Sequence, residues 1–174
     1  GTVKGLSKSE NTAIISFDAH LDLRDEYMNL KTSHTTFMRR INEQIKPETI
    51  IEIGTRAACQ EELNYAKKQG ITYITTQQIQ KNPTQKTLSA IRKALTNAKQ
   101  IYLTIDMDVL DPAYAPAVQN PETDGLTAET FYDLLQGIMD RRITAMDVVE
   151  VTPPYDNGNT AALAAKTRYE LISN

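Results

Sequence analysis

Two short stretches of the sequence, residues 16–22 and 101–108, concentrate side chains that bind metal ions. In each stretch, acids or a histidine stand two residues apart, directly after an apolar run. Side chains two apart on an extended chain point the same way. If the extended backbone continues past the apolar run, each stretch directs its ligands to one point. The five candidate ligands are Asp18, His20, Asp22, Asp106 and Asp108.

Four carboxylates and one imidazole form a hard, oxygen-rich ligand set. Such a set suits Mn²⁺, with Mg²⁺ or Fe²⁺ as alternatives, and is too rich in carboxylate for structural zinc. Four anionic groups around a single divalent ion would repel one another, whereas two ions that share bridging carboxylates balance the charge. Two-metal sites hold their ions about 3.5–4 Å apart and make water nucleophilic at neutral pH. Aspartates after strands also hold turns, but the paired motifs favour a two-ion hydrolytic centre.

The elements around these motifs alternate between strands and helices. We expect strands at 12–17, 49–54, 71–75, 101–105 and 143–149, and helices at 36–44, 60–69, 83–98, 127–140 and 160–172. Gly54 is expected to allow a turn, Gly70 to close a helix, and Asn82 and Thr127 to cap helices. Residues 106–126 form a long loop, which is often functional. The alternation predicts one α/β domain over residues 1–174, a three-layer α/β/α fold with a mostly parallel sheet. Ligands then bind beyond the carboxyl ends of the strands.

The composition is that of an ordinary globular protein. The 174 residues are 40% apolar and 24% charged, with a formal net charge of -3, so nothing indicates nucleic-acid binding. No apolar run is long enough to span a membrane, and no signal-peptide pattern is present. The single cysteine excludes an internal disulfide framework and fits a reducing cytoplasm.

Four segments, in this order, resemble the signature motifs of the ureohydrolase (arginase/agmatinase) family. They are Asp-Ala-His-Leu-Asp at 18–22, Ser-His-Thr-Thr at 33–36, Ile-Asp-Met-Asp-Val-Leu-Asp-Pro-Ala-Tyr-Ala-Pro at 105–116 and Asp-Val-Val-Glu-Val-Thr-Pro-Pro-Tyr-Asp at 147–156. The resemblance extends from about residue 12 to the end, and the segment 18–40 is most similar to the agmatinase branch. It implies a binuclear manganese hydrolase that converts agmatine and water into putrescine, a polyamine, and urea.

The resemblance also implies a role for each matching residue. Asp18 and Asp106 would bridge two Mn²⁺ ions, and Asp22 would bind one ion and orient the nucleophile. The other ion would be bound by His20 and Asp108. Two further residues would act on the substrate, namely His34 as the proton shuttle and Glu150 as the partner of the guanidinium. Protonation of a leaving amine suits histidine, and a planar cation suits a planar carboxylate. The family further implies a homo-oligomer, a trimer or hexamer.

The sequence departs from the family pattern in two places. The family carries another metal-binding histidine in an upstream Gly-Gly-Asp-His motif, whereas this chain begins at Gly1. We therefore expect a C-terminal part of the family's domain, without roughly a hundred N-terminal residues and some strands of the sheet. The loop 117–125 also lacks most of the glycines typical of the family. That loop shapes the rim of the site and so bears on the choice of substrate.

Other functions compete with agmatine hydrolysis. Arginase or guanidinobutyrase activity would use the same centre. Arginine needs extra polar partners for its α-carboxylate and α-amine, and residues 55–62 are a candidate source. A non-catalytic fragment or pseudo-enzyme without a complete metal site is the rival of another class. A two-metal phosphodiesterase is a weaker alternative, because the ligand segments contain few basic residues apart from Arg24.

Overall fold

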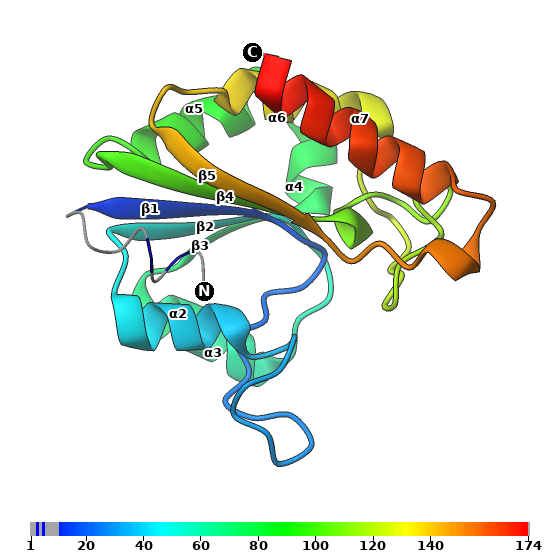
Figure 1. Ribbon diagram of the computed structural model, residues 1–174. Coiled ribbons are helices and arrows are strands. Elements are labelled where there is room, and N and C mark those ends of the chain that lie inside the picture. Colours follow the sequence, from blue (N-terminus) through cyan, green and yellow to red (C-terminus); the bar gives the residue numbers. More distant parts are fainter. Residues whose placement is uncertain (1–2, 4, 6–10, 174) are drawn as a thin grey trace.

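The computed structural model describes residues 3, 5 and 11–173, in which strands and helices alternate as expected (Figure 1). The elements are β1 (Thr12–Phe17), α2 (Phe37–Ile45), β2 (Thr49–Thr55), α3 (Gln60–Gln69), β3 (Thr72–Thr75), α4 (Thr76–Lys81), α5 (Thr84–Ala94), β4 (Gln100–Asp106), α6 (Ala128–Ile138), β5 (Ile143–Val149) and α7 (Asn159–Ser173). Short 3₁₀ turns occupy Met107–Val109 and Pro153–Tyr155. None of the helices described is both long and apolar enough to cross a membrane.

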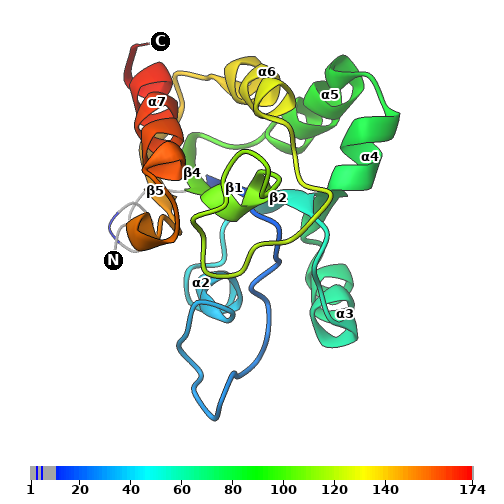
Figure 2. The ribbon, with the colours of Figure 1, turned by 90° about the vertical axis from the view of Figure 1, so that its right-hand side faces the viewer.

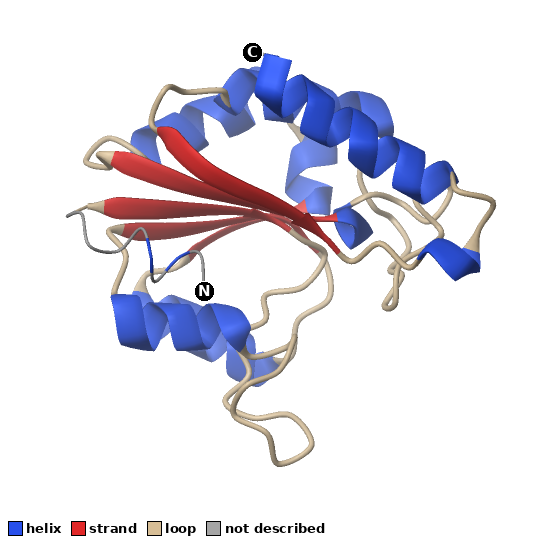
Figure 3. Ribbon diagram, viewed as in Figure 1, coloured by secondary structure: helices blue, strands red, loops and turns tan. Residues whose placement is uncertain are grey.

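The five strands form one sheet in the order β3-β2-β1-β4-β5, and every pairing is parallel. Helices α2 and α3 cover one face, and α4 to α7 cover the other (Figures 1 and 3). The expected three-layer α/β/α fold is thus confirmed. Because the strands are parallel, their carboxyl ends share one edge, which faces the viewer in Figure 2.

Two apolar clusters fix the sheet between its helical layers. On the side of α5 and α6, Phe17 of β1 packs edge to face on Phe131, with ring centroids 5.4 Å apart. On the side of α2 and α3, Ile14 and Ile50 join Met38 in the second cluster. All six residues of β1 are buried. Each fully buried large apolar side chain contributes about 1.5–3 kcal/mol, so the strand ends that carry the candidate ligands are firmly held.

Two of the expected caps are confirmed. The Thr127 hydroxyl accepts a hydrogen bond of 3.1 Å from the Thr130 amide and begins α6. Gly70 adopts the left-handed conformation that ends α3, with φ of 70°.

The region 76–98 differs from the expectation. Helix α4 was not predicted, because its six residues, TQQIQK, are too few and too polar to show a helical period. Asn82 ends α4 and does not cap the next helix, and Pro83 holds the cap position of α5. Helix α5 ends at Ala94, short of the predicted residue 98.

Gly54 forms a bulge and not the expected turn. Strand β2 continues to Thr55, and its register with β3 shifts between Ile53 and Thr55. Gly54 has φ of +98°, and an added Cβ would lie 2.4 Å from Cγ2 of Val109. The glycine therefore allows β2 to pass close to the turn that follows β4.

The loop after β4 is tied at both ends. The Asp111 amide donates to the Leu126 carbonyl and the Leu126 amide to the Val109 carbonyl, each at 3.0 Å. These bonds form an isolated parallel bridge between Leu110 and Leu126. The loop therefore leaves the strand edge and returns to it, and it lies in front of the carboxyl ends of β1 and β2 (Figure 2).

Candidate metal centre

The two central strands bring the two ligand motifs together. Phe17 of β1 is in register with Ile105 of β4, so Asp18 and Asp106 come next to each other along the sheet. Asp106 ends β4, and Asp18 directly follows β1. Glu150 directly follows β5, at the same edge. The predicted position of these acids, at carboxyl ends of strands, is confirmed.

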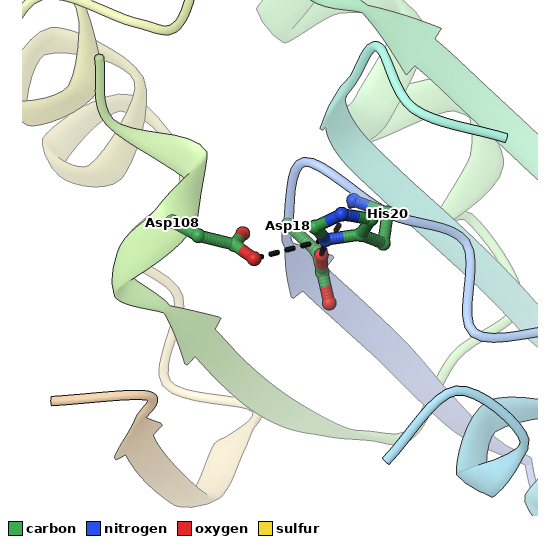
Figure 4. A group of neighbouring side chains, drawn as sticks. All are labelled: Asp18, His20 and Asp108. Carbon is green, nitrogen blue, oxygen red and sulfur yellow. Dashed lines mark hydrogen bonds and ion pairs between the residues drawn. The ribbon is translucent and has the colours of Figure 1, made fainter. Parts of the chain in front are cut away.

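Three of the five candidate ligands converge (Figure 4). One ligand atom from each of Asp18, His20 and Asp108 lies within 4.8 Å of the other two. His20 Nδ1 is 2.9 Å from Asp108 Oδ2 and 3.5 Å from Asp18 Oδ1. Both carboxylates are buried, and the imidazole is partly exposed. The group thus joins a histidine to two acids from neighbouring strand ends.

Backbone amides orient the acids. Asp18 Oδ1 accepts a 2.6 Å hydrogen bond from the amide of His20, two residues on. Asp108 Oδ1 accepts from the Ala19 amide at 3.0 Å, and Asp106 Oδ1 accepts from the Asp108 amide at 2.8 Å. These backbone bonds fix the orientation of the three carboxylates.

Asp22 lies apart from the three-residue group. The expectation of an extended backbone through residue 22 is wrong, because the chain bends at Ala19 and His20. Asp22 itself is left-handed, with φ of 52°. Its carboxylate, like that of Asp106, nevertheless lines the same cavity as His20 and Asp108. The motif at 18–22 therefore contributes His20 and Asp22 to the cavity wall.

The electrostatics of the cluster favour a cation. Burial raises the pKa of Asp18, Asp22 and Asp106 above the ordinary carboxyl range, and the charges of neighbouring aspartates raise it further. Burial lowers the pKa of His20, but hydrogen bonds to Asp108 and Asp18 outweigh it and raise that pKa to about 11. The acids thus concentrate more negative charge than they can hold without protons or a cation.

The donor set fits a divalent metal. Carboxylate oxygens predominate and one imidazole nitrogen joins them, which suits Mn²⁺ better than a structural zinc ion. A buried, carboxylate-rich cluster would also gain more from a doubly charged ion than from one protonated histidine.

A cavity of about 210 Å³ adjoins these residues. His34 and Glu150 both line it. His34 is exposed and packs edge to face on Tyr27, with ring centroids 5.5 Å apart. Glu150 is left-handed, with φ of 59°, which turns the chain away immediately after β5.

Arg56 and Glu122, neither of which was singled out from the sequence, also belong to this region. Glu122 lines the cavity, and its Oε1 lies 3.6 Å from His20 Nε2. Arg56 belongs to the segment considered for contacts to an amino acid substrate, but its guanidinium donates to backbone carbonyls, including that of Asp108 at 2.7 Å. Such contacts between distant segments leave no pattern in the sequence.

A larger cavity, of about 460 Å³, lies along β5 and is lined by residues that include Met139, Met146 and Leu171. Its wall is mainly apolar, and the candidate ligands lie elsewhere, so the smaller cavity is the one suited to chemistry.

Comparisons with known proteins identify the family to which the chain belongs. Residues 1–173 match the model of the Arginase family. An agmatinase of Bacillus anthracis is 34% identical over 91% of this chain and 53% of its own length. A guanidinobutyrase of Pseudomonas aeruginosa is 31% identical over 95% of this chain and 53% of its own.

The solved structure of the agmatine ureohydrolase of Thermoplasma volcanium superposes with a TM-score of 0.87 at 32% identity, and covers 99% of this chain and 58% of that one. The chain thus spans little more than half the length of these relatives.

Proposed function

Because this chain belongs to the arginase family, we propose that it acts as a ureohydrolase that converts agmatine and water into putrescine and urea. The observation that carries the proposal is the convergence of Asp18, His20 and Asp108, within 4.8 Å, beside a cavity lined by Glu150 and His34. The agmatinase and agmatine ureohydrolase among its relatives support agmatine as the substrate.

We propose that the four acids and one histidine hold two Mn²⁺ ions in the complete subunit. Asp18 and Asp106 would be shared between the ions, Asp22 would belong to one, and His20 and Asp108 to the other. Bound ions of this kind make water a strong nucleophile at neutral pH. The high density of buried carboxylate described above supports the assignment.

Two residues of the cavity wall would act directly on the substrate. The Glu150 carboxylate can accept two parallel hydrogen bonds from the N–H groups of a guanidinium. These bonds would hold the guanidinium carbon next to the candidate metal ligands. The guanidinium carbon is a poor electrophile, so this orientation matters more than it would for an ester. His34, on the exposed side of the cavity, would deliver a proton to the departing amine.

Guanidinobutyrate is the second candidate substrate. It carries a carboxylate where agmatine carries an ammonium group. Arg24 lines the cavity and could pair with that carboxylate, and a guanidinobutyrase is among the relatives. Glu122, on the same wall, favours the cationic tail of agmatine.

Urea release tests the proposal. The protein is incubated with Mn²⁺ and, in turn, with agmatine, guanidinobutyrate and arginine, and urea and amine are measured. We expect equal amounts of urea and putrescine from agmatine, and loss of both after chelation of the metal. Release of no urea from any guanidino compound would refute hydrolysis by this chain and favour the non-catalytic alternative.

A further inference from the structure

The guanidinium of Arg56 connects segments that are remote in sequence. Arg56 follows β2 directly, and its three nitrogen atoms all donate to main-chain carbonyls. The acceptors are the carbonyl oxygens of Gly54 at 3.3 Å, Asp108 at 2.7 Å, Val109 at 3.2 Å, Leu110 at 3.3 Å, Glu122 at 2.8 Å and Thr123 at 2.9 Å. One side chain therefore ties the turn after β4 to the far end of the loop above it.

The backbone of Arg56 holds the other half of the site. Its amide donates to the Ala19 carbonyl at 2.8 Å, and the Ala57 amide donates to the same oxygen at 3.0 Å. Ala19 lies between Asp18 and His20. Arg56 thus contacts both ligand motifs, one through its amide and the other through its guanidinium.

Two of the six carbonyls that Arg56 binds belong to residues that face the ring nitrogens of His20, namely Asp108 and Glu122. Asp108 Oδ2 lies 2.9 Å from Nδ1, and Glu122 Oε1 lies 3.6 Å from Nε2. A shift of either backbone segment would change these distances directly. Arg56 therefore controls the surroundings of His20 without contacting its ring.

Holding a guanidinium in this place costs solvation energy, since desolvation lowers the pKa of Arg56. The five N–H groups of the guanidinium share these six carbonyl acceptors, and the contacts offset that cost only in one arrangement of the loop. A lysine would keep the charge but has a single nitrogen, which cannot span all six acceptors.

We propose that Arg56 is a positioning residue that sets Asp108 and Glu122 against His20 and thereby shapes the metal centre. The proposal rests on the proposed function in one respect, because the centre that Arg56 positions is the one assigned there to Mn²⁺. The arrangement around His20 can be measured with no metal present.

The chain contains a matched control at the other end of the sheet. Arg142 precedes β5 and donates from Nη1 to the carbonyls of Leu95 and Ala98, each at 2.8 Å. It also pairs with Asp140. R142K should therefore cost stability in the same way as R56K but leave the surroundings of His20 unchanged.

The test compares R56K and R142K by nitrogen-15 NMR of the histidine rings and by Mn²⁺ titration. The chain has two histidines, and the H34Q variant assigns the signals. In R56K, we expect the His20 ring signals to shift and the His34 ring signals to remain unchanged. The Kd for Mn²⁺ should rise about tenfold, as is typical when a residue that orients metal ligands is replaced. In R142K, the His20 ring signals and the Kd for Mn²⁺ should match those of the parent protein.

Unchanged His20 signals in a folded R56K protein would overturn the proposal, whatever its thermal stability. If the parent binds no Mn²⁺ but R56K still shifts His20, the positioning role stands and the proposed function fails. If R56K does not fold, the proposal is tested on the parent protein. The Arg56 Nε–H group should then exchange slowly with water, because it donates to the Thr123 carbonyl. A fast-exchanging Nε–H would contradict the proposal.

Discussion

The Nδ1 atom of His20 lies 2.9 Å from Oδ2 of Asp108, and this contact joins the segment after β1 to the turn after β4. The two residues come from different motifs and meet because their strands are neighbours at the centre of the sheet. The contact therefore brings the two sequence motifs into one site.

Mn²⁺ bound by Asp108 and its neighbours should stabilise the fold. An ion that binds only the folded state adds about 2.7 kcal/mol at a concentration of 100 times Kd. We expect Mn²⁺ to raise the Tm of the parent protein and to lose this effect in Asp108→Asn, measured by calorimetry. Asp133→Asn, which changes an exposed residue of α6, is the control and should respond like the parent. An equal response of both variants would exclude Asp108 as a ligand.

Glu150→Gln should weaken substrate binding and turnover while the metal site stays intact. Hydrogen bonds to a charged partner contribute about 1.5–3 kcal/mol, which corresponds to a loss in kcat/KM of roughly 10- to 100-fold. Steady-state kinetics with agmatine measure the loss. The control is Glu129→Gln, on the exposed side of α6. Parent-like kinetics in Glu150→Gln would contradict a contact between Glu150 and the guanidinium.

His34→Gln should reduce kcat more than it raises KM. General acid catalysis typically contributes about 10²- to 10⁴-fold, and glutamine cannot transfer the proton. The affinity for Mn²⁺ should not change, because His34 lies outside the three-residue group. A large loss of Mn²⁺ affinity with unchanged kcat would instead make His34 a ligand.

Glu52→Gln should stabilise the protein at alkaline pH. Glu52 is 1% exposed, its Oε1 has no partner among the described residues, and burial raises its pKa well above the ordinary value. The folded state then holds the proton more tightly than the unfolded chain, so stability falls as pH rises above the ordinary glutamate range.

Glutamine cannot ionise, so the Tm gain should be present at pH 8 and absent near pH 4. Each kcal/mol gained in the free energy of unfolding raises the Tm by about 2–4 °C in a chain of this size. Melting is followed with a chelator present, and exposed Glu48→Gln is the control. A gain of the same size at both values of pH would argue against an ionisation effect.

Gly54→Ala should destabilise the fold more than Gly70→Ala. Both glycines have positive φ, but only at Gly54 does an added Cβ meet another atom, Cγ2 of Val109 at 2.4 Å. Overpacking costs about 1–3 kcal/mol, which urea unfolding resolves. Adding Val109→Ala should recover part of the loss. Equal costs at both glycines would show that backbone strain alone decides.

The strands and the acids at their ends could be predicted from the sequence, because continuous apolar runs such as Ala13–Ile15 are typical of buried parallel strands. The path beyond a strand could not, since the left-handed turn at Asp22 depends on tertiary contacts. The role of Arg56 could not be predicted either, because its partners are backbone carbonyls, which every residue has. Glu52 did leave a signal, a single charge within the apolar run of β2.

Saturable binding of Mn²⁺ to the chain is the most direct test of the metal centre. Equilibrium dialysis followed by metal analysis should find saturable Mn²⁺ binding in the parent protein, and none in the double variant Asp18→Asn and Asp108→Asn. No saturable binding by the parent, or equal binding by the double variant, would contradict the assignment of these residues as ligands.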